Sequence, residues 1–512
     1  MADPVATTDS GQVRGLRLET VIRFAGIPYA APTAGVNRFR PPQPLTPWSG
    51  VRDAVDFGPA ALQIVRSGRE QEIGRTGEDS LVVNVWTPGL TDSRPVLFWI
   101  HGGGFGQGVG HTDVTDGTRL AFEEDVVVVS VNHRLGMFGY LDLEHAAGER
   151  FAGSGIAGML DLERALEWVR DNIAGFGGDP GNVTIFGHSG GAGKVATLLA
   201  MPRARELFHR AVMHGGPPFG YSDVDTAADT ADRLLHVLGV RHAPQAIAEI
   251  PVERLCDAQA ELGVGALPGV NGMLFAPVVG SGHFPERPED ALASGAAADI
   301  DVMAGTALDE ADYALFARPH WLHDDFDIGA DDLVGRVASS IDDASGAGAL
   351  VERYRSHRNA RNIDLLCEIM SDQFLVRTRR LVEAKLDGDG GRTYLYVCDV
   401  NHGQKIGSFH GVQIPFFFDT VTEASRSMPI AATRENLAHA AEARHAQAEF
   451  ARHGRPTLNG TPWRAYDRES KAQYVFGESG SALVNDPYRH RHERWRDVAV
   501  TSRVDPWARL FA

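Results

Sequence analysis

Cysteine is scarce in this chain of 512 residues. The three cysteines are Cys256, Cys367 and Cys398, and no two of them form a Cys-x-x-Cys pair. An odd number at such wide spacing argues against a disulfide framework, and it gives no support to a cysteine-based metal site. We therefore expect a protein without disulfide bonds.

Positive charge is also scarce, and almost all of it is arginine. Lysine and arginine together number 49 against 67 aspartates and glutamates, so the formal net charge is −18. Such a charge repels phosphate backbones and anionic lipids, so we expect neither nucleic acid nor a membrane as a partner. Lysine occurs only at Lys194, Lys385, Lys405 and Lys471. The bias toward arginine by itself predicts no function.

Long apolar segments are lacking as well. No window of about 18 residues is continuously apolar, which argues against a membrane-spanning helix. The first residues, MADPVATTDSGQVRG, have neither the basic start nor the apolar stretch of a secretion signal. These two observations predict a cytoplasmic protein.

What the chain has in quantity is short apolar runs. Hydrophobic residues make up 43% of it and charged residues 23%, which suits a folded enzyme with a sizeable core. LVVNVWTP (81–88), PVLFWI (95–100) and VVVVSV (126–131) predict strands that are buried on both faces. In 158–178, by contrast, apolar residues recur every three or four positions, which is typical of a helix.

Alternating strands and helices indicate an α/β fold, with a mainly parallel central sheet flanked by helices. The first 60 residues are rich in proline and glycine and predict a small N-terminal antiparallel sheet. Because the chain has no internal repeat and no long linker, we expect residues 1–512 to form a single domain. Helical insertions are expected around 216–300 and 312–385, and HRHER (490–494) is expected to be an exposed tail.

Two glycine-rich turns could carry chemistry, and the first is GHSGG (187–191). It lies directly after the apolar strand VTIF and directly before a predicted helix. A serine on such a sharp strand-to-helix turn, here Ser189, is exposed at the edge of the sheet. Its oxygen also lies near a helix N-terminus, whose dipole favours negative charge. Taken alone, the turn could equally be a glycine-rich connection with an incidental serine.

The second turn, HGGGF (101–105), follows the strand PVLFWI. Consecutive glycines can present backbone N–H groups to an oxyanion with no side chain in the way. Gly103 and Gly104, together with Gly190 after the serine, would form an oxyanion hole of three donors. Two such turns, each at the end of a buried strand, favour an acyl-transfer enzyme.

A serine nucleophile also needs a base and an orienting carboxylate, which follow it in the order acid, then histidine, in sheets with this turn. Asp309, Glu310 and Asp312 compete for the acid, and spacing does not choose among them. His410 is the preferred base and His402 is the second choice. No HExxH motif is present, so a metal mechanism has little support.

Segments in order along nearly the whole chain resemble one family. They are FAGIPYAAP (24–32), RFRPPQP (38–44), GEDSLVVNVWTP (77–88), WIHGGGF (99–105), VNHRLGMFGYL (131–141), LDLERALEWVRDNIAGFGGDPGNVTIFGHSGG (160–191), LFHRAVMHGG (207–216), AGTALDE (304–310), SFHGVQIPFFF (408–418) and TPWRAYD (461–467). The chain thereby resembles the type-B carboxylesterases, the cholinesterase-like branch of the α/β-hydrolase fold.

The resemblance implies an α/β-hydrolase fold with helical insertions over the active site. It implies that Glu310, which ends the GTxxDE turn, is the acid, and that His410, before the apolar PFxF run, is the base. Two-step acyl transfer then follows, with Ser189 as the nucleophile and with oxyanion donors from the backbone. Those donors are Gly103, Gly104 and Gly190. Because water attacks the acyl-enzyme, we expect no cofactor and no metal.

The chain departs from the family pattern close to the serine. His188 stands where the family usually has Glu or Gln, and His214 where it usually has Ser. Gly190 and Gln413 replace an alanine and an acidic residue. One hypothesis is that His188 and His214 lie beside the triad and add an ionisation of the activity near pH 6–7. The alternative is that both are neutral, packed histidines. The missing acid beside the serine weakens the case for cationic, choline-like substrates.

The predicted function is therefore a serine hydrolase that cleaves a small-molecule carboxylic ester. An amide or carbamate hydrolase with the same triad is the main alternative, because pocket shape sets the leaving-group preference. A non-catalytic cholinesterase-like binding protein is more remote, since such proteins typically lose a triad residue. The oligomeric state is not indicated. Aromatic candidates for the substrate pocket, each also compatible with a core position, are Phe219, Tyr221, Phe275, Phe316 and Trp321.

Overall fold

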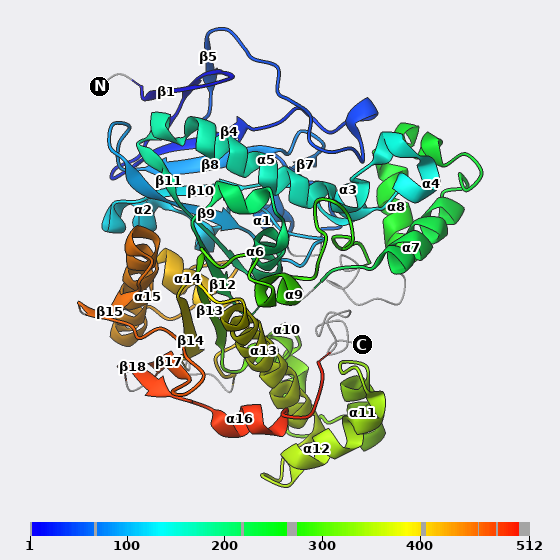
Figure 1. Cartoon of the computed structure of the whole chain (residues 1–512), viewed down its shortest axis with the longest axis vertical. Coiled ribbons are helices and arrows are strands. Elements are labelled where there is room, and N and C mark those ends of the chain that lie inside the picture. The colour runs from blue at the N-terminus through cyan, green and yellow to red at the C-terminus, as the bar shows by residue number, and fades with distance from the viewer. Residues whose placement is uncertain are drawn as a thin grey trace.

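A large mixed sheet forms the centre of the molecule (Figure 1). The computed structural model describes residues 3–65, 69–216, 220–263, 274–400, 406–458, 460–477 and 480–500. In this part of the chain the 11-stranded sheet has the order β18 (Gly480–Asn485), β17 (Ala472–Gly477), β14 (Thr393–Asp399), β13 (Asp301–Ala307), β12 (Arg210–His214), β11 (Gly178–His188), β9 (Arg94–Ile100), β10 (Val127–Val131), β8 (Val82–Thr87), β4 (Ile22–Pro28) and β3 (Leu16–Arg17).

The pairing within this sheet matches the predicted architecture. All neighbours from β17 across to β10 pair in parallel. The outer strands, β18 at one edge and β8, β4 and β3 at the other, pair antiparallel. Because parallel neighbours end at the same edge, the turns that follow β9, β11 and β13 meet there.

The parallel strands are buried on both faces, which explains their continuous apolar runs. In β9, Val96, Phe98 and Ile100 belong to one hydrophobic cluster, whereas Leu97 and Trp99 belong to a second. Successive side chains of a strand point to opposite faces, so each face needs its own helical cover. Helices α5 and α6 contribute to the first cluster, and α2, α14 and α15 contribute to the second.

The helices predicted in 158–178 and directly after Ser189 are both present in the structure. The helix predicted in 158–178 is α5 (Ala157–Asn172), which continues into the short 3-10 helix η5 (Ile173–Phe176). The other described α-helices are α1 (Glu70–Ile73), α2 (Thr118–Glu124), α3 (Gly136–Tyr140), α4 (Glu144–Ala147), α6 (Gly190–Ala200), α7 (Val224–Val237), α8 (Val252–Leu262), α9 (Pro288–Ala293), α10 (Tyr313–Ala317), α11 (Ala330–Ala338), α12 (Ala347–Arg355), α13 (Asn362–Asp387), α14 (Gln413–Phe418), α15 (Arg434–His453) and α16 (Arg489–Arg494).

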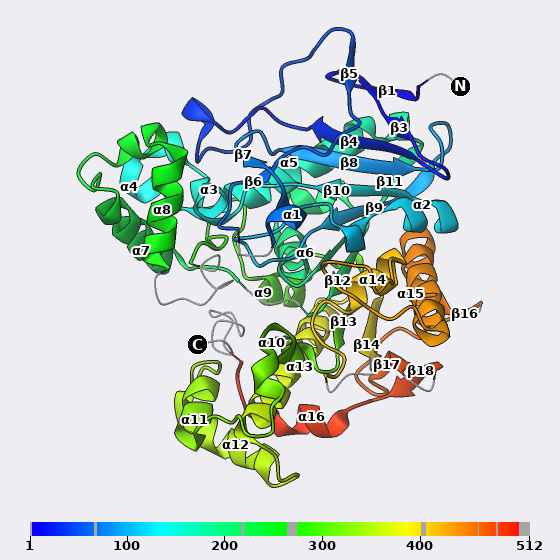
Figure 2. The same ribbon diagram turned by 180° about the vertical axis from the view of Figure 1, so that it is seen from behind.

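Segments far apart in sequence close the second face of the sheet. Helices α2 and α15 lie side by side in both views (Figures 1 and 2). Arg444 of α15 forms an ion pair of 2.8 Å with Glu124 of α2. Helices α7, α8 and α9 lie in the first predicted insertion, and α10 to α13 lie in the second.

The small N-terminal sheet differs in one pairing from the prediction. Strands β1 (Val5–Thr8) and β2 (Gly11–Arg14) form the predicted antiparallel hairpin, but β5 (Val51–Asp53) adds in parallel to β2. The long connection through β3 and β4 brings the chain back in the same direction, as parallel pairing requires. Two further sheets, of two strands each, are β6 (Ala60–Ala61) with β7 (Thr76–Gly77), and β15 (Thr457–Leu458) with β16 (Thr461–Pro462).

The segment HRHER is not an exposed tail, and that prediction is wrong. It forms α16, from which the Arg491 guanidinium donates to Leu308 O at 3.0 Å and to Asp372 Oδ1 at 3.2 Å. A third contact of Arg491 joins it to Asp309 at 3.4 Å. Asp372 is fully buried, and a buried carboxylate needs a cationic partner. That requirement draws α16 onto the protein.

The cysteines agree with the prediction of a chain without disulfides. Cys256, Cys367 and Cys398 all carry free thiols. Across the described ranges, we find no helix with the length and apolarity needed to cross a bilayer.

Candidate active site

Ser189 lies at the turn between β11 and α6 and is half-buried. Its φ of 57° and ψ of −122° are unusual for a residue with a side chain. Gly187 and Gly191, on either side of this serine, are required because a side chain has no room at their positions. A Cβ on Gly187 would lie 2.5 Å from the carbonyl carbon of Gly191, and a Cβ on Gly191 would lie 2.1 Å from Ile100 O. The sequence prediction of a tight turn around an accessible serine is therefore met.

His410 joins the serine to an acid. Its Nε2 lies 2.7 Å from Ser189 Oγ, and its Nδ1 contacts Glu310 Oε2. The backbone N–H of His410 also donates to the carbonyl oxygen of Glu310 at 3.1 Å. The imidazole packs beside the rings of His188 and Phe374, at centroid distances of 4.5 and 5.5 Å. The three side chains predicted as nucleophile, base and acid thus lie in one hydrogen-bonded row.

Glu310 is fully buried and its two carboxylate oxygens have different partners. Oε2 faces His410, whereas Oε1 accepts from the backbone N–H of Ala307 at 2.7 Å and from Gln413 Nε2 at 3.2 Å. The two donors fix the rotation of the carboxylate and leave Oε2 to face the imidazole.

The other two candidate acids hold the histidine loop instead. Asp312 Oδ2 accepts from the backbone N–H of Gly407 at 2.9 Å, and Asp309 Oδ2 accepts from that of Ser408 at 3.3 Å. Burial and the neighbouring charge of Asp309 raise the pKa of Asp312 to about 7. All three acids of the turn therefore act on the loop that carries His410, and Glu310 is the one that reaches the imidazole.

The glycine-rich turn 101–105 lies directly against the start of α6. A Cβ on Gly102 would lie 3.5 Å from Ser189 Cβ, and a Cβ on Gly190 would lie 2.4 Å from Gly104 N. Gly103 and Gly104 have φ values of 92° and 63°, in the region that glycine adopts without strain. The turn that carries Gly103 and Gly104 therefore lies close to Ser189 and Gly190.

Comparison with known proteins agrees with this geometry. The model of the carboxylesterase family matches residues 2–495. Para-nitrobenzyl esterase of Bacillus subtilis (strain 168) is 32% identical over 505 residues, which cover 96% of this chain and 99% of that protein. The chain belongs to the carboxylesterase family. Phenmedipham hydrolase of Pseudarthrobacter oxydans is 30% identical to this carboxylesterase over 516 residues, or 96% of the chain and 98% of that protein.

Solved structures place the carboxylesterase in the α/β-hydrolase fold. A carboxylesterase of Geobacillus stearothermophilus superimposes with a TM-score of 0.84 at 33% identity, over 96% of this chain and 99% of the other. A thermophilic PNB esterase gives a TM-score of 0.83 at 30% identity, over 96% and 100%. The protein is accordingly a serine hydrolase that cleaves carboxylic esters, and its family acts on small-molecule esters.

Restoring the family's alanine at Gly190 is expected to damage this carboxylesterase. The new Cβ would lie 2.4 Å from Gly104 N and 2.5 Å from Gly104 Cα, so the turn 101–105 would have to move away from Ser189. Loss of one oxyanion donor costs roughly 10²–10³ in kcat. We expect Gly190→Ala to lower kcat by about that factor with little change in KM, measured with a p-nitrophenyl ester. A kcat within about twofold of the parent would show that the turn tolerates the methyl group.

The surroundings of His188 and His214 favour the alternative that both are neutral, packed histidines. His214 Nδ1 lies 2.6 Å from Tyr396 Oη and its Nε2 lies 2.8 Å from Gln447 Oε1. Burial lowers the pKa of His214 to about 4. Burial, followed by the neighbouring imidazoles of His410 and His214, holds the pKa of His188 well below its usual value.

A variant at His188 tests this neutral state. Because burial holds the pKa of His188 well below its usual value, we expect its imidazole to stay neutral over an assay range of pH 5.5 to 8. His188→Gln is therefore expected to change the level of kcat/KM but not the shape of its dependence on pH. A loss of one ionisation in that range, seen in the pH profile of the variant, would contradict the assignment.

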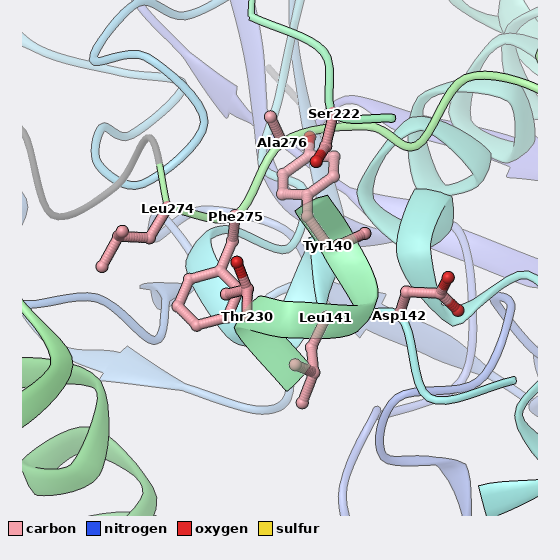
Figure 3. Close-up of a pocket in the computed structure, with 9 residues that line it drawn as sticks. Tyr140, Leu141, Asp142, Ser222, Thr230, Leu274, Phe275 and Ala276 are labelled. Carbon is pink, nitrogen blue, oxygen red and sulfur yellow. The ribbon is translucent and has the colours of Figure 1, made fainter. Parts of the chain in front are cut away.

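The remaining sequence candidates fall into two groups. His402 and Phe219, together with the side chain of Phe316, lie outside the described part of the chain. Tyr221, Phe275 and Trp321 are buried, and Phe275 lines a small pocket (Figure 3). The other residues of that pocket are Tyr140, Leu141, Asp142, Ser222, Ala227, Thr230, Leu274 and Ala276. In the described ranges no group of three or more His, Cys, Asp or Glu is arranged to hold a metal ion.

One residue close to the site has no predicted role in the sequence analysis. Lys194 of α6 is fully buried, and its Nζ donates to Gly104 O at 2.7 Å and to His101 O at 3.2 Å. The signal that could have found it is the position of a lysine in the helix after the nucleophile, in a chain with only four lysines.

Proposed function

We propose that Ser189, His410 and Glu310 are the nucleophile, base and acid with which this carboxylesterase hydrolyses its esters. The carrying observation is the hydrogen-bonded row from Ser189 Oγ through His410 to the buried carboxylate of Glu310. A strained serine on a strand-to-helix turn supports the same assignment, since such strain is kept at functional sites.

In the first step Ser189 Oγ attacks the ester carbonyl while its proton passes to His410 Nε2. The Glu310 carboxylate holds the other ring nitrogen as an N–H and stabilises the imidazolium that forms. The backbone N–H groups of Gly103, Gly104 and Gly190 donate to the oxyanion. When the C–O bond to the alcohol breaks, the imidazolium gives its proton to the leaving oxygen.

In the second step water attacks the acyl-enzyme and His410 takes the proton of that water. Collapse of the tetrahedral intermediate returns the proton to Ser189 and releases the carboxylic acid. Every proton moves between groups of the chain, the substrate and water, so the proposed cycle needs no cofactor and no metal.

The environment of the serine favours an uncharged substrate. Two residues close to the triad differ from the family pattern. His188 stands where the family usually has Glu or Gln, and Gln413 stands where it usually has an acid. Neither brings a negative charge to the site. We infer that neutral small-molecule esters are preferred over cationic ones. We also propose that residues 1–512 form one domain, with insertions at 216–300 and 312–385. We propose further that the protein acts in the cytoplasm and that nucleic acid is not among its partners.

The assignment is tested by covalent labelling and by a substrate panel. A fluorophosphonate is expected to attach once per chain, on the peptide that contains Ser189, and the Ser189→Ala chain is expected to stay unlabelled. p-Nitrophenyl esters of increasing acyl length are compared with matched anilides and carbamates under the same conditions. Faster turnover of the esters supports an esterase. Preferred turnover of anilides or carbamates would favour the alternative with the same triad, and a label on another residue would refute the assignment.

A further inference from the structure

Lys194 lies behind the turn that holds the proposed oxyanion donors. It follows Gly190 by four positions in α6, so the two residues share one side of the helix. Side chains of a helix tilt toward its N-terminus, which directs the lysine back toward the turn. Its Nζ donates to Gly104 O at 2.7 Å and to His101 O at 3.2 Å, and it lies 5.4 Å from the ring centre of Phe105.

The carbonyl groups of this turn decide where its amides point. In a trans peptide unit the C=O and the N–H point in opposite directions. Gly102 O accepts from His101 Nδ1 at 2.9 Å, which directs the N–H of Gly103 the other way. Gly103 O accepts from the N–H of Gln107 at 3.1 Å, which does the same for Gly104. Lys194 binds the carbonyls on either side of these two units, His101 O and Gly104 O.

A fully buried lysine is costly in this position. The positive end of the α6 dipole is nearby, and in the described part of the chain burial alone, with no carboxylate partner, shifts the pKa of Lys194. The titratable groups that face it from other elements are His101, after β9, and His133, after β10. The pKa of each is lowered by burial and, next in size, by the charge of Lys194. The pKa of His101 falls to about 3, and the charge of Arg69 contributes to that shift.

We propose that Lys194 is a positioning residue of the hydrolysis. Its ammonium group fixes the turn 101–105 against Gly190, and its positive charge stabilises the negative oxygen that forms in the transition state. This inference rests on the proposed function, because it assumes that the amides of Gly103 and Gly104 bind that oxygen. Gly190, which has no Cβ, is what allows Gly104 to approach α6 closely enough for the lysine to bind it.

The charge of Lys194 changes near neutral pH. Burial lowers its pKa to about 7, so the ammonium form is present below that pH and is lost above it. The protonation of Lys194 affects folding stability and catalysis with opposite dependence on pH. The unfolded chain keeps a lysine protonated to about pH 10, so this residue makes folding stability rise with pH between about 7 and 10. Its contribution to catalysis has the opposite sign, because it needs the proton that the folded state releases.

The experiment compares Lys194→Met with a matched control, Lys385→Met. Lys385 is also buried, and its Nζ donates to two backbone carbonyls, Ala297 O at 2.8 Å and Gly390 O at 3.1 Å, at the far end of α13. Both variants remove a buried ammonium group and leave two carbonyls without it. kcat and KM for a p-nitrophenyl ester, and the inhibition constant of a trifluoromethyl ketone, are measured from pH 5.5 to 9.

We expect Lys194→Met to lower kcat about tenfold at pH 6 and to weaken the ketone by a similar factor, with KM changed less than twofold. The ratio of parent to variant kcat should shrink as pH rises through the pKa of the lysine. Lys385→Met should keep the parent profile. A Lys194→Met profile that parallels the parent at every pH, or an equal loss in both variants, would overturn the inference.

The pH profile of the parent and the labelling of its serine give two further tests. If Lys194→Met does not fold, the parent itself provides the test, since kcat must fall from pH 7 to 9 while the unfolding temperature does not. A kcat that keeps rising over this range refutes the role of the ammonium group. Fluorophosphonate labelling of Ser189 in the parent tests the proposed function separately from the inference about Lys194. Labelled Ser189 with unchanged Lys194→Met kinetics rejects the lysine alone, and unlabelled Ser189 rejects the proposed function.

Discussion

Ser189→Ala is expected to lower kcat for ester hydrolysis by about 10⁶, the loss seen when the nucleophile of a serine triad is removed. The reason is that the Oγ that forms the acyl-enzyme is gone, and His410 Nε2 no longer has a hydroxyl proton to accept at 2.7 Å. Some acceleration over the uncatalysed reaction should persist, because the backbone amides still bind the oxyanion. The measurement is steady-state hydrolysis of a p-nitrophenyl ester by purified protein.

A suitable control is Ser340→Ala. This serine is also buried, and its Oγ donates to Val337 O at 2.8 Å after the end of α11 and not to a residue of the triad. It should keep the parent kcat. Ester hydrolysis that survives in Ser189→Ala at more than about a thousandth of the parent rate would show that another nucleophile does the chemistry.

Much of the central site could be predicted from the sequence because its geometry is local. A serine between two glycines at the end of an apolar strand has few backbone conformations open to it, and the observed φ of 57° is the one that the motif demands. The two-sided burial of β9 followed from its continuous apolar run. The choice of Glu310 over Asp309 and Asp312 needed the family resemblance, because all three lie within one short turn.

The features that were missed depend on contacts between distant residues. Arg491 lies 119 positions from Asp372, and nothing near HRHER shows that a buried carboxylate awaits it. The role inferred for Lys194 depends on carbonyls about 90 positions earlier in the chain. The environment of His188 and His214 was hard to predict for the same reason. Burial by neighbouring strands and helices lowers the pKa of each, and a sequence pattern does not measure that burial.

Glu310→Gln is expected to lower kcat by about 10⁴ by imposing the wrong tautomer on His410. Two donors, Ala307 N at 2.7 Å and Gln413 Nε2 at 3.2 Å, point at Oε1. The carbonyl oxygen of the new amide must take that place, so its NH2 group faces His410 Nδ1. That nitrogen can then only accept, which puts the ring proton on Nε2. An Nε2–H cannot remove the proton of Ser189.

Asp312→Asn is the matched control for this replacement, because it also changes an acid of the same turn into its amide. Asp312 Oδ2 accepts from Gly407 N at 2.9 Å, a bond that an amide oxygen can keep. Its pKa is raised to about 7 by burial, so below that pH the acid is already largely neutral. We expect its kcat at pH 6 to stay within about threefold of the parent. An equal loss of kcat in Glu310→Gln and Asp312→Asn would mean that catalysis depends on the total negative charge of the turn. Glu310 would then not act through the tautomer of the imidazole.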